Sequence, residues 1–464
     1  MENPENPVVT GCFHVLFRRS MYITLSIMTI LVVLTLYNDF LNNPTLTSLD
    51  DSTFPVTNVP FPGISVCSLN KISKRKAEKF AERLVELTGK NRTVMMNYVR
   101  FIGQLYDFDF IPSTVDDLLE FQKILNNSGF KLTDVIKELA INCDELLESC
   151  MWQRVDVKCS EIFQMKLTHD GYCCVFTNNN SFHTKKPDKA VFTTEAGINH
   201  GLQIVVRNQL DDYFYSIISS IGITVQIFDS YDYPDKPSGN MKEILIENGS
   251  ESFIEINPTT YEAVADVRDY PVEKRGCIFR RESPTIFGSL YSLSNCIVGC
   301  RIESALALCQ CIPFKLPLSN ESTVCTIEDI PCVHRYRDKW FTMAPDEDVQ
   351  EHLPREQHDA LRCSRKCYPK CSGTFYDVQI NSFPLFNKTL VKNQLSVAYI
   401  YYGSRFSNFY RTDVFYYWFE ILSNFGGLFG LLMGFSVISA METAIYIARR
   451  IIKHYRRILW SQKY

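Results

Sequence analysis

The stretch "GLLMGFSVISAME", Gly430 to Glu442, decides the fold because it continues an apolar run yet contains glycine, serine and a carboxylate. It lies in residues 414–448, and at 35 residues this run is too long for one simple crossing, which needs about 20. A carboxylate near mid-membrane costs at least ~2.5 kcal/mol unless it faces water or a partner. Because no basic residue of the run can pair with Glu442, we expect this side chain to face a water-filled interior.

Glycines recur every four residues in the same run, at Gly426, Gly430 and Gly434. Small residues at this spacing let neighbouring helices approach closely, so a plain packing seam is one interpretation. A second interpretation is a helix break near Gly434, Phe435 and Ser436, where carbonyls turn into a water-lined pathway and replace the hydration shell of an ion. The break would also explain how so long a run fits one crossing.

A second apolar segment and the charges that flank both segments predict the topology. Residues 21–37 carry no charge, Arg18 and Arg19 precede them, and a basic tail follows the second run, so the positive-inside rule places both termini in the cytoplasm. A cleaved signal peptide is the alternative, but no small-residue cleavage site follows. The sequence thus predicts a cytoplasmic N-terminus over 1–20, transmembrane helix 1 over 21–40, an exterior over 41–413, transmembrane helix 2 over 414–448 and a cytoplasmic tail over 449–464.

Glycosylation sequons and cysteines agree with this topology. Of the 17 cysteines, 16 lie in the predicted exterior, and an even number in an oxidising compartment favours disulfides. The alternative is a zinc site formed by Cys309, Cys311, Cys325 and Cys332. All six sequons also lie in the exterior, at Asn91, Asn126, Asn179, Asn248, Asn320 and Asn387.

The exterior reads as a mixture of helices and strands, an α+β pattern. Residues 42–70 predict an edge strand that leaves the membrane, and "KRKAEKFAERLVELTGK" predicts an amphipathic helix that stops at Gly89. "VDDLLEFQKIL" is also helical, and strand-like runs occupy 203–228, 251–267 and 374–402.

Two helical stretches each carry cysteines four residues apart, which places both sulfurs on one helix face. One stretch contains Cys296 and Cys300, and the other ends with Cys363 and Cys367. If the two helices are antiparallel, they can be bridged only in crossed order, although 16 cysteines allow far too many connectivities for sequence alone to fix the pairing.

One chain offers two membrane segments, which are too few to surround water. Several copies must therefore assemble around a central pathway, where Glu442 forms a ring of acids attractive to cations. The net charge of −4 gives no reason to expect a nucleic-acid partner. No serine–histidine or cysteine–histidine arrangement stands out, so we do not expect an enzyme.

The two short intracellular ends, the cysteine-rich exterior and "GGLFGLLMGFSVISAME" resemble the degenerin/epithelial sodium channel family. "FPVTNVPFPGISVCSLNKIS" and "KRGCIF" look like its insect pickpocket branch. The resemblance implies a plasma-membrane homo- or heterotrimer in the lipid bilayer, with an exterior of palm, finger (about 71–150), thumb (about 277–371), knuckle and β-ball. It also implies permeant Na⁺, with no cofactor and no bound metal.

Site residues follow from the same resemblance. The selectivity filter matches Gly434, Phe435 and Ser436, the position where bulky residues lock degenerins open matches Ser423, and the amiloride position matches Gly427. The implied disulfides are Cys67–Cys173, Cys150–Cys159, Cys277–Cys371, Cys296–Cys367, Cys300–Cys363, Cys309–Cys332 and Cys311–Cys325, which leaves Cys143 and Cys174 as the remaining pair.

The sequence departs from the family in two places. Thr10-Gly11 stands where the family has a cytoplasmic His-Gly motif, and Phe435 is bulky where vertebrate members are small. The leading hypothesis is a sodium-preferring, amiloride-type channel subunit opened by an extracellular stimulus. The alternative is a non-conducting two-pass receptor or auxiliary subunit that needs a partner chain to conduct.

The stimulus itself stays open among acid, peptide, pheromone, osmotic and mechanical signals, and no extracellular ligand is predicted. Two acidic clusters, Asp229/Asp232/Asp235 and Asp346/Glu347/Asp348, could form a proton or calcium site. Solvated loops are the blander interpretation of both clusters, and we favour it.

Overall fold

The computed structural model describes residues 7–107, 115–176, 190–283, 290–317, 323–342, 367–434 and 436–461. The chain divides into two units. The small unit consists of Met1–Thr47, Val264–Arg275 and Thr412–Tyr464, and the large unit consists of Ser48–Ala263 and Gly276–Arg411. The predicted helix "DEDVQEHLPREQHDALRCSRKC" falls almost wholly outside the described residues.

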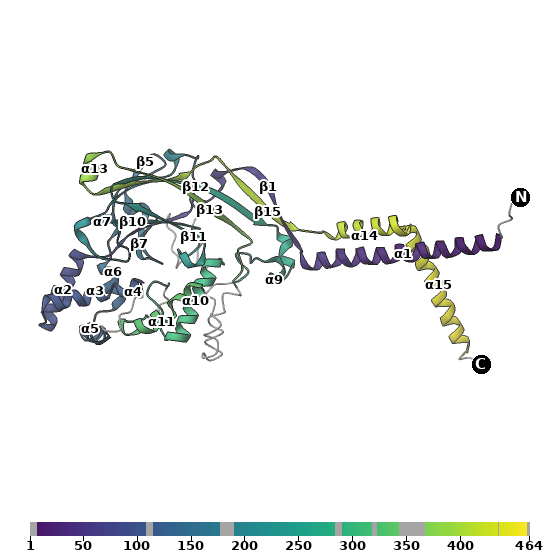
Figure 1. The fold of residues 1–464 in the computed structure, drawn as a ribbon, viewed down its shortest axis with the longest axis horizontal. Coiled ribbons are helices and arrows are strands. Elements are labelled where there is room, and N and C mark those ends of the chain that lie inside the picture. Colours follow the sequence, from purple (N-terminus) through teal and green to yellow (C-terminus); the bar gives the residue numbers. More distant parts are fainter. Residues whose placement is uncertain are drawn as a thin grey trace. The chain divides into compact units, whose positions relative to one another are not determined.

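Two β-sheets form the centre of the large unit (Figure 1). The larger has eight strands in the order β1-β15-β12-β14-β8-β4-β5, with β13 also paired to β12, and the smaller has the order β11-β10-β2-β7-β6. A third sheet pairs β3 with β9. The strands are β1 (Thr45–Pro55), β2 (Gly63–Ser68), β3 (Asn70–Ser73), β4 (Leu147–Trp152), β5 (Val155–Val157), β6 (Phe163–Thr168), β7 (Gly171–Phe176), β8 (Leu202–Arg207), β9 (Tyr213–Ser216), β10 (Gly222–Phe228), β11 (Met241–Glu247), β12 (Ser250–Ala263), β13 (Ser372–Pro384), β14 (Leu395–Tyr402) and β15 (Phe406–Val414).

Residue composition explains the arrangement of the strands. β10, "GITVQIF", is buried at every position, as expected for a β-branched run covered on both faces. Ile64 and Val225 of the smaller sheet pack in one core with Ile256 and Ile400 of the larger sheet. The predicted edge strand is confirmed, because β1 ends the larger sheet.

Helices of the large unit pack beside the sheets around a second core that includes Phe80, Met95, Val99, Phe121 and Ile136. They are α2 (Lys74–Thr88), α3 (Arg92–Phe101), α4 (Gln104–Asp107), α5 (Val115–Asn127), α6 (Leu132–Leu139), α7 (Cys143–Leu146), α8 (Cys159–Ile162), α10 (Leu293–Cys309), α11 (Ile330–Thr342) and α13 (Lys388–Lys392).

The predicted helix stop at Gly89 is confirmed. The hydroxyl of Ser73 accepts a hydrogen bond from the backbone N–H of Lys76 at the start of α2, and Gly89 adopts a left-handed conformation (φ 68°) at its end. A side chain with a Cβ would be strained in that conformation. The apolar face between these caps, Ala77, Phe80 and Leu84, is buried.

Helices dominate the small unit. α1 (Pro7–Asn42) contains the apolar span Leu16–Asn42, and α9 (Val272–Arg275) is a single turn. α14 (Trp418–Met433) lies beside α1 (Figure 1), and α15 (Val437–Ser461) follows it. One described helix, α1, is long and apolar enough to cross a membrane, and α14 with α15 meets the same criterion only as a bent pair.

Candidate functional site

The helical run at the C-terminus breaks at the positions where the sequence predicts a break. α14 ends at Met433, and Gly434 adopts a left-handed conformation with φ 65°. Its N–H donates to the carbonyl of Gly430 over 3.1 Å, which closes the last turn of α14. Glycine adopts this conformation without strain, so Gly434 is suited to end a helix here.

Ser436 starts the next helix. Its hydroxyl oxygen accepts a hydrogen bond from the N–H of Ser439 at 3.3 Å, and its carbonyl accepts one from the N–H of Ala440 at 3.0 Å. This is the N-cap arrangement that serine favours, and it leaves α15 to begin at Val437. Gly434 and Ser436 thus encode the break, and Phe435 between them lies outside the described residues.

The structure places Ser423 and Gly427 one turn apart on α14, both exposed, so they share a helix face. A Cβ built on Gly426 or Gly427 would meet no other atom within 4 Å among the described residues. Glu442 lies on α15 and is also exposed. The glycine face of α14, at Gly426 and Gly427, therefore has room for another helix. No described segment of this chain occupies it.

The polar side chains of α1 are satisfied within the helix itself. The hydroxyls of Ser26, Thr29 and Thr35 donate to the carbonyls of Tyr22, Leu25 and Leu31, at 2.7 to 2.9 Å. In hydrocarbon an unsatisfied hydroxyl is costly, and this back-bonding removes the cost. Only 6% of the most apolar stretch of α1 is buried. Its apolar surface is therefore available to lipid or to other chains.

Hydrogen bonds connect the segment that follows α1 to the segment that precedes α14. The N–H of Phe415 donates to the carbonyl of Pro44 at 2.8 Å, and the hydroxyls of Thr47 and Thr412 lie 2.8 Å apart. The N–H of Val264 donates to the carbonyl of Thr412 at 3.0 Å. The ends of both helices therefore meet the segment that leads into α9.

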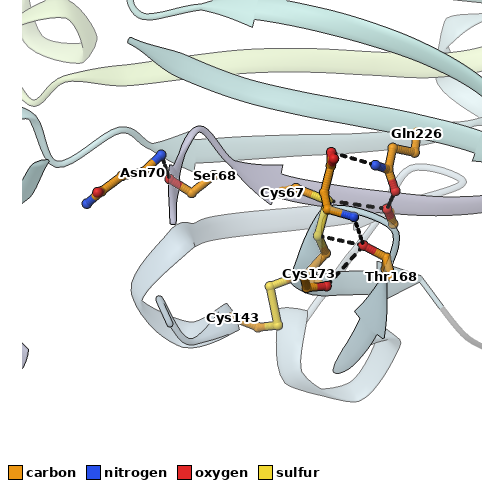
Figure 2. Close-up of a disulfide and its surroundings, with 11 residues drawn as sticks. Cys67, Ser68, Asn70, Cys143, Thr168, Cys173 and Gln226 are labelled. Atoms are coloured by element: carbon orange, nitrogen blue, oxygen red, sulfur yellow. Dashed lines mark hydrogen bonds between the residues drawn. A yellow bond between two sulfur atoms is a disulfide. The ribbon is translucent and has the colours of Figure 1, made fainter. Parts of the chain in front are cut away.

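Disulfides link distant segments of the large unit. The described ones are six of the pairs that the family resemblance implies and the pair Cys143–Cys174, which was expected by elimination. They are Cys67–Cys173, Cys143–Cys174, Cys150–Cys159, Cys277–Cys371, Cys296–Cys367, Cys309–Cys332 and Cys311–Cys325. The predicted Cys300–Cys363 pair lies partly outside the described residues, because Cys363 does. The neighbours Cys173 and Cys174 thus bond to different partners, and Thr168 Oγ1 lies 3.1 Å from the sulfur of Cys173 (Figure 2).

The zinc alternative fails on the same bonds. A zinc site needs free thiolates, whereas Cys309 and Cys311 are oxidised in bonds to Cys332 and Cys325. Asp329 lies close to Cys311 and Cys325, but a single carboxylate beside a disulfide is not a zinc ligand set.

The preference for a solvated loop at the first acidic cluster is wrong. Asp229, Asp232 and Asp235 are buried, because basic side chains from distant parts of the chain pair with them. Lys370 Nζ lies 2.6 Å from Asp229 Oδ2 and 3.2 Å from Asp232 Oδ1. Arg301 Nη1 lies 2.6 Å from Asp235 Oδ1. The second cluster, Asp346/Glu347/Asp348, lies outside the described residues.

The carboxylates of Asp229 and Asp232 share the ammonium group of Lys370, and their pKa values shift in opposite directions. Burial raises the pKa of Asp232 to about 6, although Lys370 opposes the shift. Burial acts on Asp229 in the same direction, but the attraction and hydrogen bond of Lys370 outweigh it and lower its pKa. Burial alone would lower the pKa of Lys370, yet the two carboxylates raise it. The cluster can therefore bind a proton in mildly acidic conditions.

Sequence reasoning missed both basic partners. Lys370 comes directly before Cys371, and Arg301 is an isolated basic residue of α10, so neither shows a local pattern that marks it. The only signal was the three acids themselves, since carboxylates that fold into a core require counter-charges.

The sequons remain predictions of glycosylation. Asn91, Asn126 and Asn387 are exposed. Asn248 is half-buried and accepts a hydrogen bond from Asn208 at 2.8 Å. Asn179 and Asn320 lie outside the described residues.

Comparison with known proteins finds relatives that are named as sodium channels or pickpocket proteins. Sodium channel protein Nach of Drosophila ananassae is 26% identical over 442 residues, covering 92% of this chain and 80% of the relative. Pickpocket protein 11 of Drosophila melanogaster is 23% identical, covering 90% of this chain and 69% of the relative. Epithelial sodium channel subunit gamma of Neoceratodus forsteri is 22% identical, covering 66% of this chain and 46% of the relative.

The sequence profile described as amiloride-sensitive sodium channel matches residues 19–446, nearly the whole chain. The matched residues include 19–42 of α1, the described disulfides of the large unit and the break at Gly434. The chain therefore belongs to the amiloride-sensitive sodium channel family, which confirms the resemblance found in its sequence.

Proposed function

We propose that this chain is a subunit of a trimeric, sodium-preferring, amiloride-type cation channel of the plasma membrane, opened by an extracellular stimulus. The break between α14 and α15 carries the proposal. A glycine that ends one helix and a serine that starts the next leave backbone groups free of helical hydrogen bonds, and such backbone is tolerated at membrane depth only where it lines water or is buried in protein.

Several observations support the assembly. The open glycine face of α14 admits a neighbouring helix, and its exposed apolar side chains, such as Leu422 and Leu431, need lipid or other copies around them. In this arrangement α1 and the α14–α15 pair are the two spans, both termini are cytoplasmic, and the large unit forms the exterior palm, finger, thumb, knuckle and β-ball. Relatives that carry the words sodium channel in their names support sodium as the permeant ion.

Substitutions at the break test the filter. We expect Gly434→Ala and Ser436→Ala to shift the reversal potential when external Na⁺ is replaced by K⁺, because both alter the backbone that would contact the ion. Ser26→Ala is the matched control for Ser436→Ala, since it removes the same hydroxyl group from α1, outside the break. Surface expression is measured for all three variants. Equal reversal potentials in wild type and both break variants, in a conducting assembly, would reject the proposal.

A second candidate is an auxiliary subunit that conducts only with a partner chain. Phe435 in the filter and Thr10 in place of the expected histidine favour it. The two candidates differ in one recording: the chain expressed alone carries an amiloride-blocked current only under the first. Under the second, current appears when a pickpocket-type subunit is added, and Gly434→Ala then changes the selectivity of the mixed channel.

A further inference from the structure

A small pocket in the large unit, separate from the break in the membrane run, combines basic side chains with apolar walls. It lies between α10, α11, the segment after α10 and the turn between β6 and β7, and its volume is about 50 Å³. Among the described residues, its lining includes three basic side chains, Arg301, Lys315 and Arg337, and no carboxylate. Trp340, Phe341 and Leu316 supply apolar surface.

Arg301 has an unused donor at this pocket. Its side chain is only 6% exposed, its Nε donates to the carbonyl of Trp340 at 2.8 Å, and its Nη1 donates to Asp235 at 2.6 Å. Among the residues that the structure describes, Nη2 has no hydrogen-bond partner although it is buried. A buried guanidinium nitrogen without an acceptor is costly, and an anion in the pocket would remove that cost.

Two of the three basic side chains at the pocket already have a carboxylate partner, which offsets part of their charge. Asp235 pairs with Arg301, and Asp338 lies 3.2 Å from the Nε of Arg337. His169 lies 3.6 Å from Asp235, and burial lowers the pKa of this histidine to about 4, so it is neutral.

Lys315 also favours an anion. Burial is the main cause that lowers the pKa of Lys315 to about 8, and the nearby charge of Lys71 lowers it too. The carboxylates of Asp170 and Asp107 act in the opposite direction and raise this pKa. A bound anion would stabilise the charged form of this lysine.

We propose that this pocket binds a short-chain organic carboxylate, with the carboxylate at Arg301 and the alkyl group against Leu316, Trp340 and Phe341. The planar fork of arginine matches a carboxylate, and the apolar walls distinguish an alkyl acid from a bare halide. The volume is far below the several hundred Å³ that drug-sized ligands occupy, so the acid is small.

Ligand-observed NMR on the full chain in lipid nanodiscs tests the site without any current. Saturation transfer from the protein is measured to acetate, propionate, butyrate and the neutral isostere propionamide, at fixed chloride. We expect saturable transfer to the acids, an affinity gain of about fourfold per methylene until the cavity is full, and no transfer to propionamide. Transfer equal for acid and amide, or absent for all acids up to about 100 mM, overturns the proposal.

Three variants locate the binding. Leu316→Phe fills the pocket and Arg301→Lys keeps the charge beside Asp235 but removes the fork, so each should weaken butyrate binding by at least about tenfold. Leu245→Phe is the matched control, because Leu245 is exposed on β11 outside the pocket. Undiminished binding in Leu316→Phe rejects this location. If chloride displaces butyrate and affinity does not depend on chain length, the site is a halide site and the carboxylate assignment is wrong.

Because the readout is binding, a failure here leaves the channel proposal untouched, and a non-conducting chain leaves this proposal untouched.

Discussion

Lys370 shows how a single side chain can hold together segments that are far apart in sequence. It contacts Asp229 and Asp232, which lie about 140 residues earlier, and it precedes the Cys277–Cys371 disulfide. All three charged groups are buried, and their mutual contacts offset the cost of removing them from water. Removing the lysine leaves both carboxylates without a counter-ion.

We expect Lys370→Met to lower the free energy of unfolding of the large unit by about 3–5 kcal/mol, because two buried carboxylates lose their counter-ion. Thermal denaturation monitored by size-exclusion chromatography measures the loss. Lys242→Met is the matched control, since Lys242 lines the cavity beside Asp229, Asp232 and Lys370 but is itself exposed. A Lys370→Met midpoint equal to that of Lys242→Met would show that the cluster contributes nothing.

The pKa of Asp232, raised to about 6, makes stability depend on pH in a defined direction. A carboxyl group with a raised pKa takes up its proton more readily in the folded state, so its contribution to stability is present at low pH and is lost as pH rises through about 6. Asp232→Asn mimics the protonated group. The variant should therefore gain thermal stability over wild type at pH about 7.5, and the gain should shrink as the pH falls through about 6 and vanish below about pH 4. If the difference in thermal stability between Asp232→Asn and wild type does not change with pH, the pKa of Asp232 is not raised. Asp229→Asn should lower thermal stability at both pH values.

Single residues also show the limits of sequence reasoning. Gly89, Gly434 and Ser436 were predictable because a helix end depends on local backbone conformation and on one or two neighbours. Asp232 and Arg301 were not, because their roles depend on residues that only the tertiary fold brings close. The open Nη2 of Arg301 has no sequence signature at all.

The helices and strands follow local patterns, but their pairing does not. The strand runs at 251–267 and 374–402 and the helix after Leu293 were predicted, and the structure has β12, β13, β14 and α10 there. The parallel pairing of β12 with β14 joins residues about 145 positions apart, which no periodicity specifies. For the same reason 16 cysteines fix no connectivity by spacing alone.

Two disulfides stabilise the region where α10 leads into α11: Cys309–Cys332 joins the two helices, and Cys311–Cys325 closes the segment between them. Cys311–Cys325 spans 14 residues, and a loop of this size contributes about 3 kcal/mol in the chain-entropy account. We expect Cys311→Ser with Cys325→Ser to lower the thermal midpoint of the large unit. Cys12→Ser is the control, because Cys12 belongs to no predicted pair. Equal midpoints for the double variant and the control would mean that packing alone, including Trp340 and Val333, holds this region.

At the scale of the whole molecule, the long helices of the small unit differ from the large unit in how much apolar surface they expose. α1, α14 and α15 present large apolar side chains, among them Leu31, Leu431 and Ile438, to their surroundings. The large unit packs most of its large apolar residues into its own cores, although some, such as Phe383 and Phe386, remain exposed. Under the proposed function, lipid and neighbouring copies cover these helices and water surrounds the large unit.

Glycosylation tests that assignment. If the large unit faces the exterior, Asn91→Gln and Asn387→Gln should each remove one glycan, seen as a faster band that peptide N-glycosidase makes equal to wild type. Pro7→Ala with Val8→Thr completes a sequon at Asn6 in the predicted cytoplasmic segment and should stay unmodified. A glycan on Asn6 would reverse the topology.

The adjacent cysteines 173 and 174 have a consequence for biosynthesis. In a chain that enters the secretory pathway from its N-terminus, Cys67 emerges 106 residues before its partner, a wait of about 5–20 s at ordinary rates of synthesis. Cys143 emerges meanwhile, and it is a ready wrong partner for Cys67 until both neighbours arrive. Maturation of this subunit should therefore depend on disulfide isomerase, and cells that lack the enzyme should retain it in the endoplasmic reticulum.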